Sequence, residues 1–546
     1  MTSLTRVGAT AGETPWEPAR ARWNARWYAE GFYSHESLAE AIALRVGRAG
    51  GVELSFYRGA DRVARHTAHD LHARSLRVAG GLHRLGLRPG DAICLQIPNS
   101  VENTVTCLAA IHLGLVIVPV VHIYGPHELG FIIRDSGARV LVVPRAWRKI
   151  DFLRRVSEIT DQGPLEHLVV IGDDVPAGAT AWRDLERADP LVTPAASSPD
   201  DTGLIVYTSG STGSPKGVRH TQNNMKAGAP AGPPSFSSEP SPATLFGSPA
   251  GHIGGMLNVL FPFLTGIGGH YLDGWDAEVA LDTISRFRLT RSSGAPLHLL
   301  TLVEAAERSD LDTSSFWYYV CGGASVPPAT IERAEALGWK ASRSYGSSEN
   351  PTTTSCSDHD PLAFRASTDG GMSPGAAVRI VDEDGVILPP GREGEIHSVG
   401  PKLFAGYTDP ALDAAAFTPD GWFRTGDVGR LDVHGHLTVT DRKKDIVIRA
   451  GENISSREVE DILVRHPAVL EAAVVGAPDP RYGERVCAFV RLRDGRSGFD
   501  LEAARHHFVD LGVARQKTPE RIIVVDDFPR SANGKVRKPE LRARLR

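Results

Sequence analysis

The chain has 546 residues, of which 41% are apolar and 23% charged, and its net charge at pH 7 is −5. This composition excludes a disordered, fibrous or membrane-embedded protein, and the length predicts roughly two to four domains. Charges of one sign form no long run, which argues against a nucleic-acid partner or an anionic-membrane surface. Only 10 of the 60 basic residues are lysine, so a lysine inside a motif is more informative than usual.

Cysteine usage and the N-terminal residues predict a cytoplasmic protein. The 5 cysteines form no Cys-x-x-Cys pair, as expected of reduced thiols rather than of a disulfide framework or a zinc site. Residues 1–30 contain no apolar signal-peptide core. The most apolar stretch, Leu108–Tyr124, is interrupted by histidine, glycine and proline, so it predicts a buried helix and strand rather than a membrane span.

Helix-like and strand-like patterns alternate after an N-terminal segment that is rich in Trp and Arg and is expected to be irregular. Thr67 and Asp70 predict the start of a helix, and Gly86 its end. A further helix is expected from about residue 101, and apolar runs predict strands at 92–97, 116–121, 140–143 and 168–171. Short apolar strands that alternate with amphipathic helices are typical of an α/β fold with largely parallel sheets.

The pattern changes near residue 440, where the charged segment Asp441–Asp445 separates two apolar stretches. The C-terminal part predicts a helix at 456–465 and strands at 472–475, 486–492 and 522–525. That content suffices for a small α+β domain. We therefore expect an N-terminal domain over residues 1–443 and a C-terminal domain over residues 444–546. A stretch rich in Gly, Pro and Ser at 227–242 predicts a long surface loop.

A glycine-rich segment at 207–218, YTSGSTGSPKGV, follows a strand-like run. Its glycines permit backbone conformations that direct several N–H groups into one concavity, and its hydroxyls and Lys216 add donors and a positive charge. These features predict a cradle for a polyphosphate. The segment is not a Walker A loop, because its lysine precedes the final glycine. The alternative is a polar surface loop, which such runs often form.

Within this segment, Ser209–Gly217 resembles the signature loop of the adenylate-forming superfamily, which includes acyl-CoA synthetases, peptide-synthetase adenylation domains and luciferases. Further motifs follow in the order of that family: YGSSE at 345–349, WFRTGD at 422–427, DRKKD at 441–445 with GEN at 451–453, and PRSANGK at 529–535. The resemblance spans residues 35–546, and by it the chain is identified as a member of the superfamily.

The resemblance implies an acyl-CoA ligase with a large multi-subdomain N-terminal α/β domain and a small mobile C-terminal lid. In that family a carboxylate attacks the α-phosphate of ATP and releases pyrophosphate, and the thiol of CoA then attacks the acyl-adenylate. ATP, Mg²⁺ and CoA are thus implied. Gly251, Gly254 and Gly255 either open a roomy acyl pocket or allow close packing. The first interpretation favours a medium-sized alicyclic or aromatic acid, and a fatty acid is the further option.

The resemblance also implies roles in nucleotide chemistry. Lys535, Glu349 and Lys216 are the implied catalytic residues, with Lys535 bridging the carboxylate and the α-phosphate. Thr208 and Glu349 are the implied Mg²⁺ contacts. The implied contacts of ATP or AMP are Thr208, Ser209, Gly210, Ser211, Thr212, Gly213, Lys216, Gly322, Gly323, Ala324, Tyr345, Gly346, Ser348, Asp427, Arg442 and Lys535.

Further implied roles concern the acid, the CoA tunnel and the hinge. The implied acyl-substrate residues are His252, Gly294 and Gly346, the tunnel residue is Gly451, and the hinge residue is Lys444. Each has a simpler interpretation when its motif is ignored. A lone histidine is more often structural, and a lysine in a linker is more often solvated.

Four further residues, which lie in or next to the later motifs, also have simpler interpretations. Glu349 taken alone is a surface carboxylate, and Asp427 a turn residue after a glycine. For Arg537 and Lys538, which follow the last motif, we expect a solvated surface.

Rival functions stay open at this point. One is an acyl-AMP ligase that loads a carrier protein, and another is a luciferase-type oxygenase. A third, an inactive nucleotide-binding protein, is disfavoured because every implied catalytic residue is present. A homodimer is a further expectation.

Overall fold

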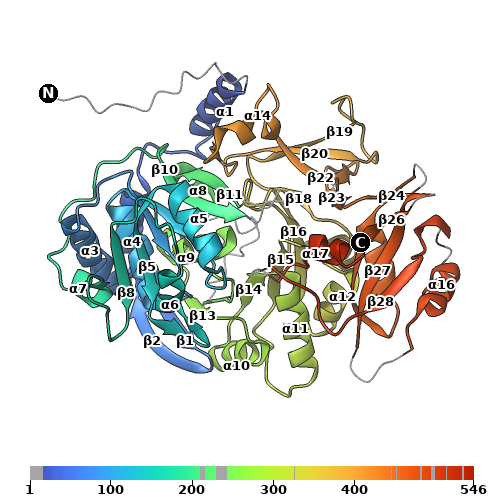
Figure 1. The fold of residues 1–546 in the computed structure, drawn as a ribbon, viewed down its shortest axis with the longest axis horizontal. Helices are drawn as coiled ribbons and strands as arrows, with labels where there is room; N and C mark the ends of the chain where they lie inside the picture. Colours follow the sequence, from blue (N-terminus) through green and yellow to red (C-terminus); the bar gives the residue numbers. More distant parts are fainter. Residues whose placement is uncertain are drawn as a thin grey trace.

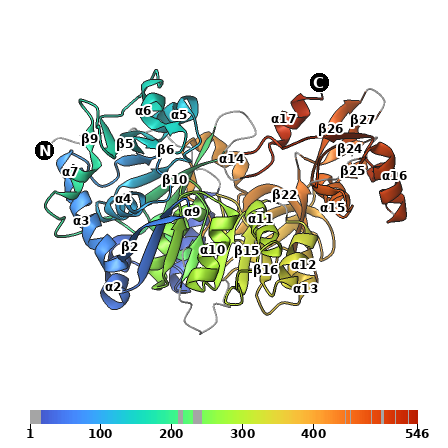
Figure 2. The same cartoon turned by 90° about the horizontal axis from the view of Figure 1, so that it is seen from below.

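The computed structural model describes residues 16–208, 215–228, 243–324, 326–443, 445–449, 452–479, 482–493, 498–511, 513, 515–531 and 534–545. A large N-terminal domain fills most of the molecule. A small C-terminal domain lies at one end, coloured red in Figures 1 and 2. The predicted mixed α/β fold, with a large and a small domain, is confirmed.

Two large sheets form the centre of the N-terminal domain. Sheet A has the order β18 (Gly371–Met372), β17 (Thr354–Ser355), β16 (Lys340–Tyr345), β15 (Tyr318–Gly322), β14 (Arg291–Gly294), β12 (Thr244–Phe246), β13 (Gly269–Leu272), β1 (Glu53–Arg58) and β2 (Asp61–Thr67). Its strands from β16 to β1 pair in parallel, and the pairs at its edges are antiparallel. The carboxyl ends of β14, β15 and β16 therefore meet at one edge.

Sheet B carries the glycine-rich segment. Its order is β21 (Gly406–Tyr407), β11 (Lys216–Thr221), β10 (Thr202–Thr208), β4 (Val116–Pro119), β3 (Ala92–Leu95), β5 (Ala138–Pro144), β8 (His167–Ile171) and β9 (Thr180–Ala181). Strands β10, β4, β3, β5 and β8 pair in parallel, as predicted, whereas β11 is antiparallel to β10. A short hairpin, β6 (Ala146–Trp147) and β7 (Ile150–Asp151), lies apart from both sheets.

Helices cover both sheets and also separate them. The helical segments of this domain are α1 (Glu17–Ala29), α2 (Leu38–Ala49), α3 (Ala68–Arg84), α4 (Val101–His112), α5 (Pro126–Ser136), α6 (Phe152–Ser157), α7 (Trp182–Glu186), α8 (Gln222–Gly228), α9 (Ile253–Thr265), α10 (Ala277–Phe287), α11 (Pro296–Glu307), α12 (Pro328–Ala336), α13 (Leu362–Ser367), η1 (Pro410–Leu412) and α14 (Asp413–Ala416). The main core joins α2, α3, α4 and α9 to one face of each sheet. Separate cores join α10–α12 to the other face of sheet A, and α5 and α6 to that of sheet B.

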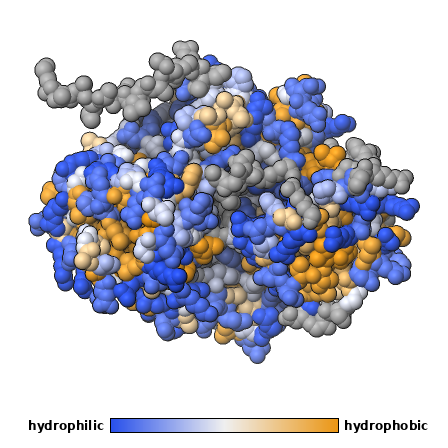
Figure 3. All heavy atoms as spheres, viewed as in Figure 1, coloured by the Kyte–Doolittle hydropathy of each residue, from blue (hydrophilic) through white to orange (hydrophobic). Residues whose placement is uncertain are grey.

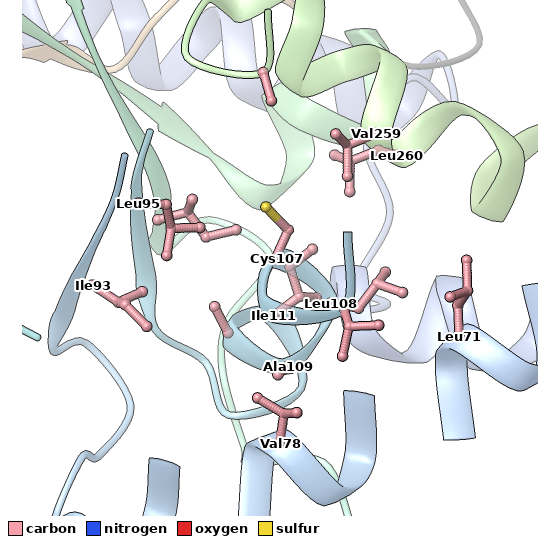
Figure 4. Close-up of a cluster of buried hydrophobic side chains, with 14 of the residues drawn as sticks. Leu71, Val78, Ile93, Leu95, Cys107, Leu108, Ala109, Ile111, Val259 and Leu260 are labelled. Atoms are coloured by element: carbon pink, nitrogen blue, oxygen red, sulfur yellow. The ribbon is translucent and has the colours of Figure 1, made fainter. Parts of the chain in front are cut away.

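Figure 4 shows the middle of the main core. Cys107 and Leu108 of α4 lie among side chains of β3, α3 and α9, which come from distant parts of the sequence. Burial raises the pKa of the Cys107 thiol to about 12. The five cysteines are all buried and free, in keeping with the expectation of reduced thiols.

Local sequence signals agree with the observed helix ends. The Thr67 hydroxyl accepts a hydrogen bond from the Asp70 amide at 3.1 Å, and the Asp70 carboxylate accepts one from the Thr67 amide at 3.0 Å. This reciprocal capping starts α3 as predicted. Gly86 follows the helix with φ of +94°, a left-handed conformation that favours glycine.

The expectation of an irregular N-terminal segment is wrong, because residues 17–29 form α1. One face of α1 is fixed by aromatic packing that only the folded chain supplies. Trp16 stacks on Phe417 at 4.3 Å between ring centroids, and Trp23 meets Trp422 edge to face at 6.1 Å. These partners lie about four hundred residues away in sequence. Tertiary contacts therefore stabilise the helix, and its own apolar pattern is too weak to predict it.

Sheet C connects the two large sheets to the small domain. Its order is β19 (Ala377–Val381), β20 (Gly394–Val399), β22 (Phe423–Leu431) and β23 (Leu437–Arg442). The small domain then contains β24 (Val447–Arg449), β25 (Glu452–Ile454), α15 (Ser456–Val464), β26 (Val469–Asp479), β27 (Gly483–Leu492), α16 (Leu501–Asp510), η2 (Arg515–Lys517), β28 (Arg521–Val524) and α17 (Lys538–Ala543). The helix and strands predicted for this region are confirmed within a few residues.

The outer surface is of mixed polarity. Hydrophilic residues are spread over the whole face seen in Figure 3, and hydrophobic residues interrupt them in patches toward both ends. Among the described residues, no helix combines the length and hydrophobicity that crossing a lipid bilayer requires.

Candidate active site

The candidate site lies where the carboxyl ends of β14, β15 and β16 meet sheet C and the C-terminal domain. The chain turns there at Gly322-Gly323 after β15 and at Tyr345-Gly346 after β16. In α/β folds, ligands bind at this edge because the loops that follow parallel strands converge there. Sheet C brings Asp427 and Arg442 to the same place, since Tyr345 binds Asp427 directly.

Asp427 is buried and held by two donors. The Tyr345 hydroxyl donates to Asp427 Oδ2 at 2.8 Å, and Arg442 Nε lies 3.0 Å from Asp427 Oδ1. The Asp427 carboxylate raises the pKa of Arg442, so this guanidinium stays charged. Burial, with the same carboxylate, raises the pKa of the Tyr345 phenol, which therefore stays a donor. The carboxylate thus has one fixed orientation, as recognition of a diol requires.

Glu349 follows the Tyr345-Gly346 turn and is held through its backbone. The Phe404 amide donates to Glu349 O at 2.7 Å, and the Glu349 amide donates to the Ser347 hydroxyl at 3.2 Å. One carboxylate oxygen accepts a hydrogen bond from the Tyr407 hydroxyl at 3.0 Å. The carboxylate therefore keeps lone pairs that can bind a further ligand.

Lys216 and Thr208 lie opposite each other on β11 and β10. Lys216 Nζ also lies 5.4 Å from the centroid of the Tyr407 ring, within the range of a cation–π interaction. Tyr407 therefore contacts Glu349 with its hydroxyl and Lys216 with its ring. Sequence reasoning missed Tyr407, whose sole local signal is an aromatic residue after a glycine, too common to mark a site.

Lys535 reaches the same edge from the C-terminal domain. A Cβ built on Gly323 would lie 4.0 Å from Lys535 Cε, and one on Gly534 would lie 3.5 Å from Leu297 on α11. Gly323 has φ of +85°, so glycine is favoured where the chain meets the lysine. The structure thus presents Lys535 to the Gly322-Gly323 turn, next to the implied nucleotide contacts.

The C-terminal domain is docked through ionic and polar contacts near residue 441. The Asp441 carboxylate accepts hydrogen bonds from the amide and the hydroxyl of Ser456, at the start of α15. Lys538 donates to the same hydroxyl at 2.7 Å and pairs with Glu460 at 2.7 Å. The expectation that Lys538 is solvated is wrong, because the acidic groups packed around it hold it inside the domain. Arg537 is exposed, as expected.

The remaining predicted residues divide into those that the structure describes and those that it does not. Ala324 is exposed directly after the Gly322-Gly323 turn, and Ser348 is half-buried, with its carbonyl accepting a hydrogen bond from His220 at 2.8 Å. The residues Ser209, Gly210, Ser211, Thr212, Gly213, Lys444 and Gly451 lie outside the described part of the chain, as does most of the predicted loop at 227–242.

The glycines near the implied acyl site mainly permit close packing. A Cβ on Gly294 would lie 2.5 Å from the Tyr319 hydroxyl and 2.9 Å from His298 Nδ1, and Gly251 and Gly255 are equally crowded by backbone. Gly254, by contrast, faces open space. Gly346 is crowded by the backbone of residue 352.

Histidines border this region as well. His252 is the N-cap residue of α9 and is half-buried. His298 stacks on Trp275 at 4.3 Å, and burial lowers the pKa of His298 to about 4, so its ring is neutral at pH 7.

Comparison with known proteins agrees with these observations. Residues 48–408 match the family described as AMP-binding enzyme, and residues 458–535 match the AMP-binding enzyme C-terminal domain. The medium-chain fatty-acid–CoA ligase of Escherichia coli (strain K12) is 35% identical over 477 residues, 86% of this chain and 84% of that protein. The 2-hydroxy-7-methoxy-5-methyl-1-naphthoate–CoA ligase of Streptomyces carzinostaticus is 31% identical over 98% of this chain and 97% of its own length.

Solved structures share the whole architecture. The anthranilate CoA ligase AuaEII, in complex with anthranoyl-AMP, aligns with a TM-score of 0.85 and 26% identity over 94% of this chain and 97% of that one. Both domains and their order along the chain are thus shared with proteins of one family. The chain belongs to the adenylate-forming superfamily, as an AMP-binding enzyme that carries the C-terminal domain of that family.

Proposed function

We propose that this chain is an AMP-forming acyl-CoA ligase, which joins a carboxylic acid to CoA at the expense of ATP. The observation that carries the proposal is the meeting of Lys535 with the Gly322-Gly323 turn, at the edge where Asp427 and Glu349 also lie. Family membership and the CoA ligases among the relatives support the same enzyme class.

The proposed reaction has two steps. A carboxylate oxygen of the acid attacks the α-phosphorus of ATP, the bond to the bridging oxygen breaks, and pyrophosphate leaves. The CoA thiol, having lost its proton, then attacks the acyl carbonyl, and AMP leaves. The first step brings two anions together, so fixed cations contribute more than an acid or a base. In this proposal Lys535 binds the α-phosphate and the carboxylate, and Lys216 binds the outer phosphates.

Asp427, oriented by Tyr345 and Arg442, accepts the ribose hydroxyls in this scheme. Glu349 and Thr208 would hold Mg²⁺, since carboxylate and hydroxyl oxygens suit this hard cation. The described residues contain no cluster of three acidic, His or Cys side chains that would form a dedicated metal cage. A magnesium ion carried by ATP needs none, and when bound it neutralises phosphate charge.

The acid itself is proposed only by class. The relatives named above act on a medium-chain fatty acid, a naphthoate and an anthranilate, according to their names. His298, neutral and stacked on Trp275, gives an aromatic border to the region beside Gly294. We propose a medium-sized aromatic or alicyclic acid, or a fatty acid. A cytoplasmic location, a homodimer and a domain boundary between residues 443 and 444 are further proposals.

The experiment is a panel of carboxylic acids incubated with the protein, ATP and Mg²⁺, with and without CoA. Pyrophosphate release that requires the acid and AMP release that requires both the acid and CoA are expected, together with an acyl-CoA product identified by mass. Pyrophosphate release that continues only when a carrier protein replaces CoA would identify the carrier-loading alternative. Absence of any acid-dependent pyrophosphate release from the folded protein would refute the enzyme proposal.

Glu349→Gln is expected to raise the Mg²⁺ concentration needed for half-maximal pyrophosphate release and to slow adenylation, because the metal loses an anionic ligand. Gln keeps an oxygen that can accept from the Tyr407 hydroxyl, so the turn should keep its shape. Glu383→Gln, at an exposed glutamate, is the matched control. A Mg²⁺ titration unchanged from wild type would exclude Glu349 from the metal contacts.

A further inference from the structure

Lys402 places its amino group in the interior of the N-terminal domain. Its exposed fraction is 2%, and it lies in the segment Gly400–Phe404, here called the strap, just before β21. Its ammonium group donates to Thr352 O at 2.5 Å and forms no ion pair with a described carboxylate. Burial lowers the pKa of Lys402 to about 7. A buried lysine without a counter-ion loses hydration that one carbonyl only partly replaces, so it lowers stability.

The acceptor of this hydrogen bond is a strained residue. Thr352 has φ of +48°, which is rare for a β-branched side chain. Its carbonyl accepts hydrogen bonds from Lys402 Nζ and from the Ser373 hydroxyl, the latter at 2.6 Å. Strained backbone persists only where surrounding contacts over-determine it, and it concentrates at functional sites. The two donors supply that constraint here.

Thr352 supports the turn that carries Glu349. A Cβ on Gly346 would collide with the Thr352 amide, so the chain folds back tightly on the Tyr345-Gly346 turn. The strap also touches this turn a second time, because the Phe404 amide donates to Glu349 O at 2.7 Å. The strap therefore holds the turn at Glu349 and again at Thr352.

The backbone of the strap on both sides of Lys402 is held by hydrogen bonds from other segments. Tyr33 Oη and Asn224 Nδ2 both donate to Pro401 O at 2.9 Å. A guanidinium of α1 donates to the carbonyl of Leu403. The carbonyls on both sides of Lys402 are thus fixed from outside, while its side chain extends inward.

We propose that Lys402 is a positioning residue of the adenylation step: it holds Thr352 in its left-handed conformation and so fixes the turn that presents Glu349 to the nucleotide. The proposal rests on the proposed function, because its effect is measured as the rate of adenylation. Its structural part is independent of any activity, because a charge kept for positioning is unfavourable for stability.

The test is Lys402→Met, which keeps an unbranched, flexible side chain that is slightly shorter and removes the amino group with its charge and its donor. The expected melting temperature is equal to or above that of the wild type. Adenylation should fall about 10–100-fold, as a displaced catalytic group typically causes, and the Mg²⁺ requirement should rise. Thioester formation from supplied acyl-adenylate should stay near the wild-type rate. A melting temperature below that of the wild type, or unchanged adenylation, overturns the proposal.

A second variant tests the role of the strained residue. Glycine adopts positive φ freely, so Lys402→Met combined with Thr352→Gly should recover much of the lost adenylation rate. The matched control is Lys226→Met, because Lys226 also donates to a backbone carbonyl, that of Glu36, but remote from the turn. It should leave the Mg²⁺ titration at the wild-type value. No recovery in the double variant overturns the proposal.

The acid panel separates this proposal from the proposed function. If the wild-type protein releases no pyrophosphate with any acid, the proposed function fails, and the melting temperatures alone decide whether the charge of Lys402 is kept against stability. If the wild type is active and Lys402→Met matches it in rate and Mg²⁺ requirement, the positioning role alone fails.

Discussion

Lys535→Ala is expected to abolish most adenylation and to spare the second half-reaction. Loss of one charged contact to a transition state typically costs about 3–4 kcal/mol, or roughly 10²–10³ in rate. The structure places Lys535 Cε 4.0 Å from the position of a Cβ on Gly323, at the edge that we assign to the nucleotide. The two rates are measured as pyrophosphate release and as consumption of preformed acyl-adenylate with CoA.

Arg537→Ala is the control for this experiment. Arg537 is a cation two residues away whose side chain is exposed and paired with Glu540, so its loss should leave both half-reactions unchanged. If Lys535→Ala slows both half-reactions equally while its melting temperature is that of the wild type, Lys535 does not have the proposed role. The comparison therefore separates a specific contact from a general loss of positive charge.

Lys444→Pro is expected to leave adenylation largely intact and to abolish thioester formation. The structure presents Lys535 to the nucleotide edge, with the C-terminal domain docked through Asp441 and Ser456. The thiol of CoA needs a path to the same adenylate, so we expect the two steps to use different arrangements of the C-terminal domain. Hinges absorb such a change at a few residues. Proline fixes φ near about −65° and would restrict that rotation.

Lys444→Ala keeps the rotational freedom and is the matched control, with both rates expected near wild type. Gly451→Leu should give the same split by another cause, since the family pattern assigns this glycine to the tunnel for the pantetheine arm. Equal slowing of both half-reactions by Lys444→Pro, or a wild-type thioester rate in Gly451→Leu, would refute the hinge and tunnel assignments. Both variants are assayed by the two measurements described for Lys535→Ala.

The sequence alone predicted the family and the main architecture of this protein. Phosphate binding requires glycines, hydroxyls and a cation at close spacing, so Lys216 and its segment are visible in the linear chain. Secondary structure was visible for a similar reason: the reciprocal cap of Thr67 and Asp70 depends on residues three apart, and the buried strands of sheet B depend on short apolar runs. Such signals depend on residues that are close in sequence, so they can be recognised without the tertiary structure.

What the sequence did not predict depends on contacts between distant segments. Helix α1 is packed against aromatic residues near position 420, and Lys538 is held by Glu460 rather than by solvent. Tyr407 links Glu349 to Lys216 only because β21 pairs with β11.

The sequence by itself therefore determined the fold class and the family and predicted the residue types of the proposed nucleotide site, because these follow from short spacings. The tertiary structure alone decided which side chains support those residues. Lys402 is the clearest case: nothing near it in sequence marks it, and its position is defined by a strained carbonyl 50 residues away. The physical reason is that the burial and orientation of a side chain depend on every segment packed around it, whereas capping and periodicity depend on neighbours in the chain.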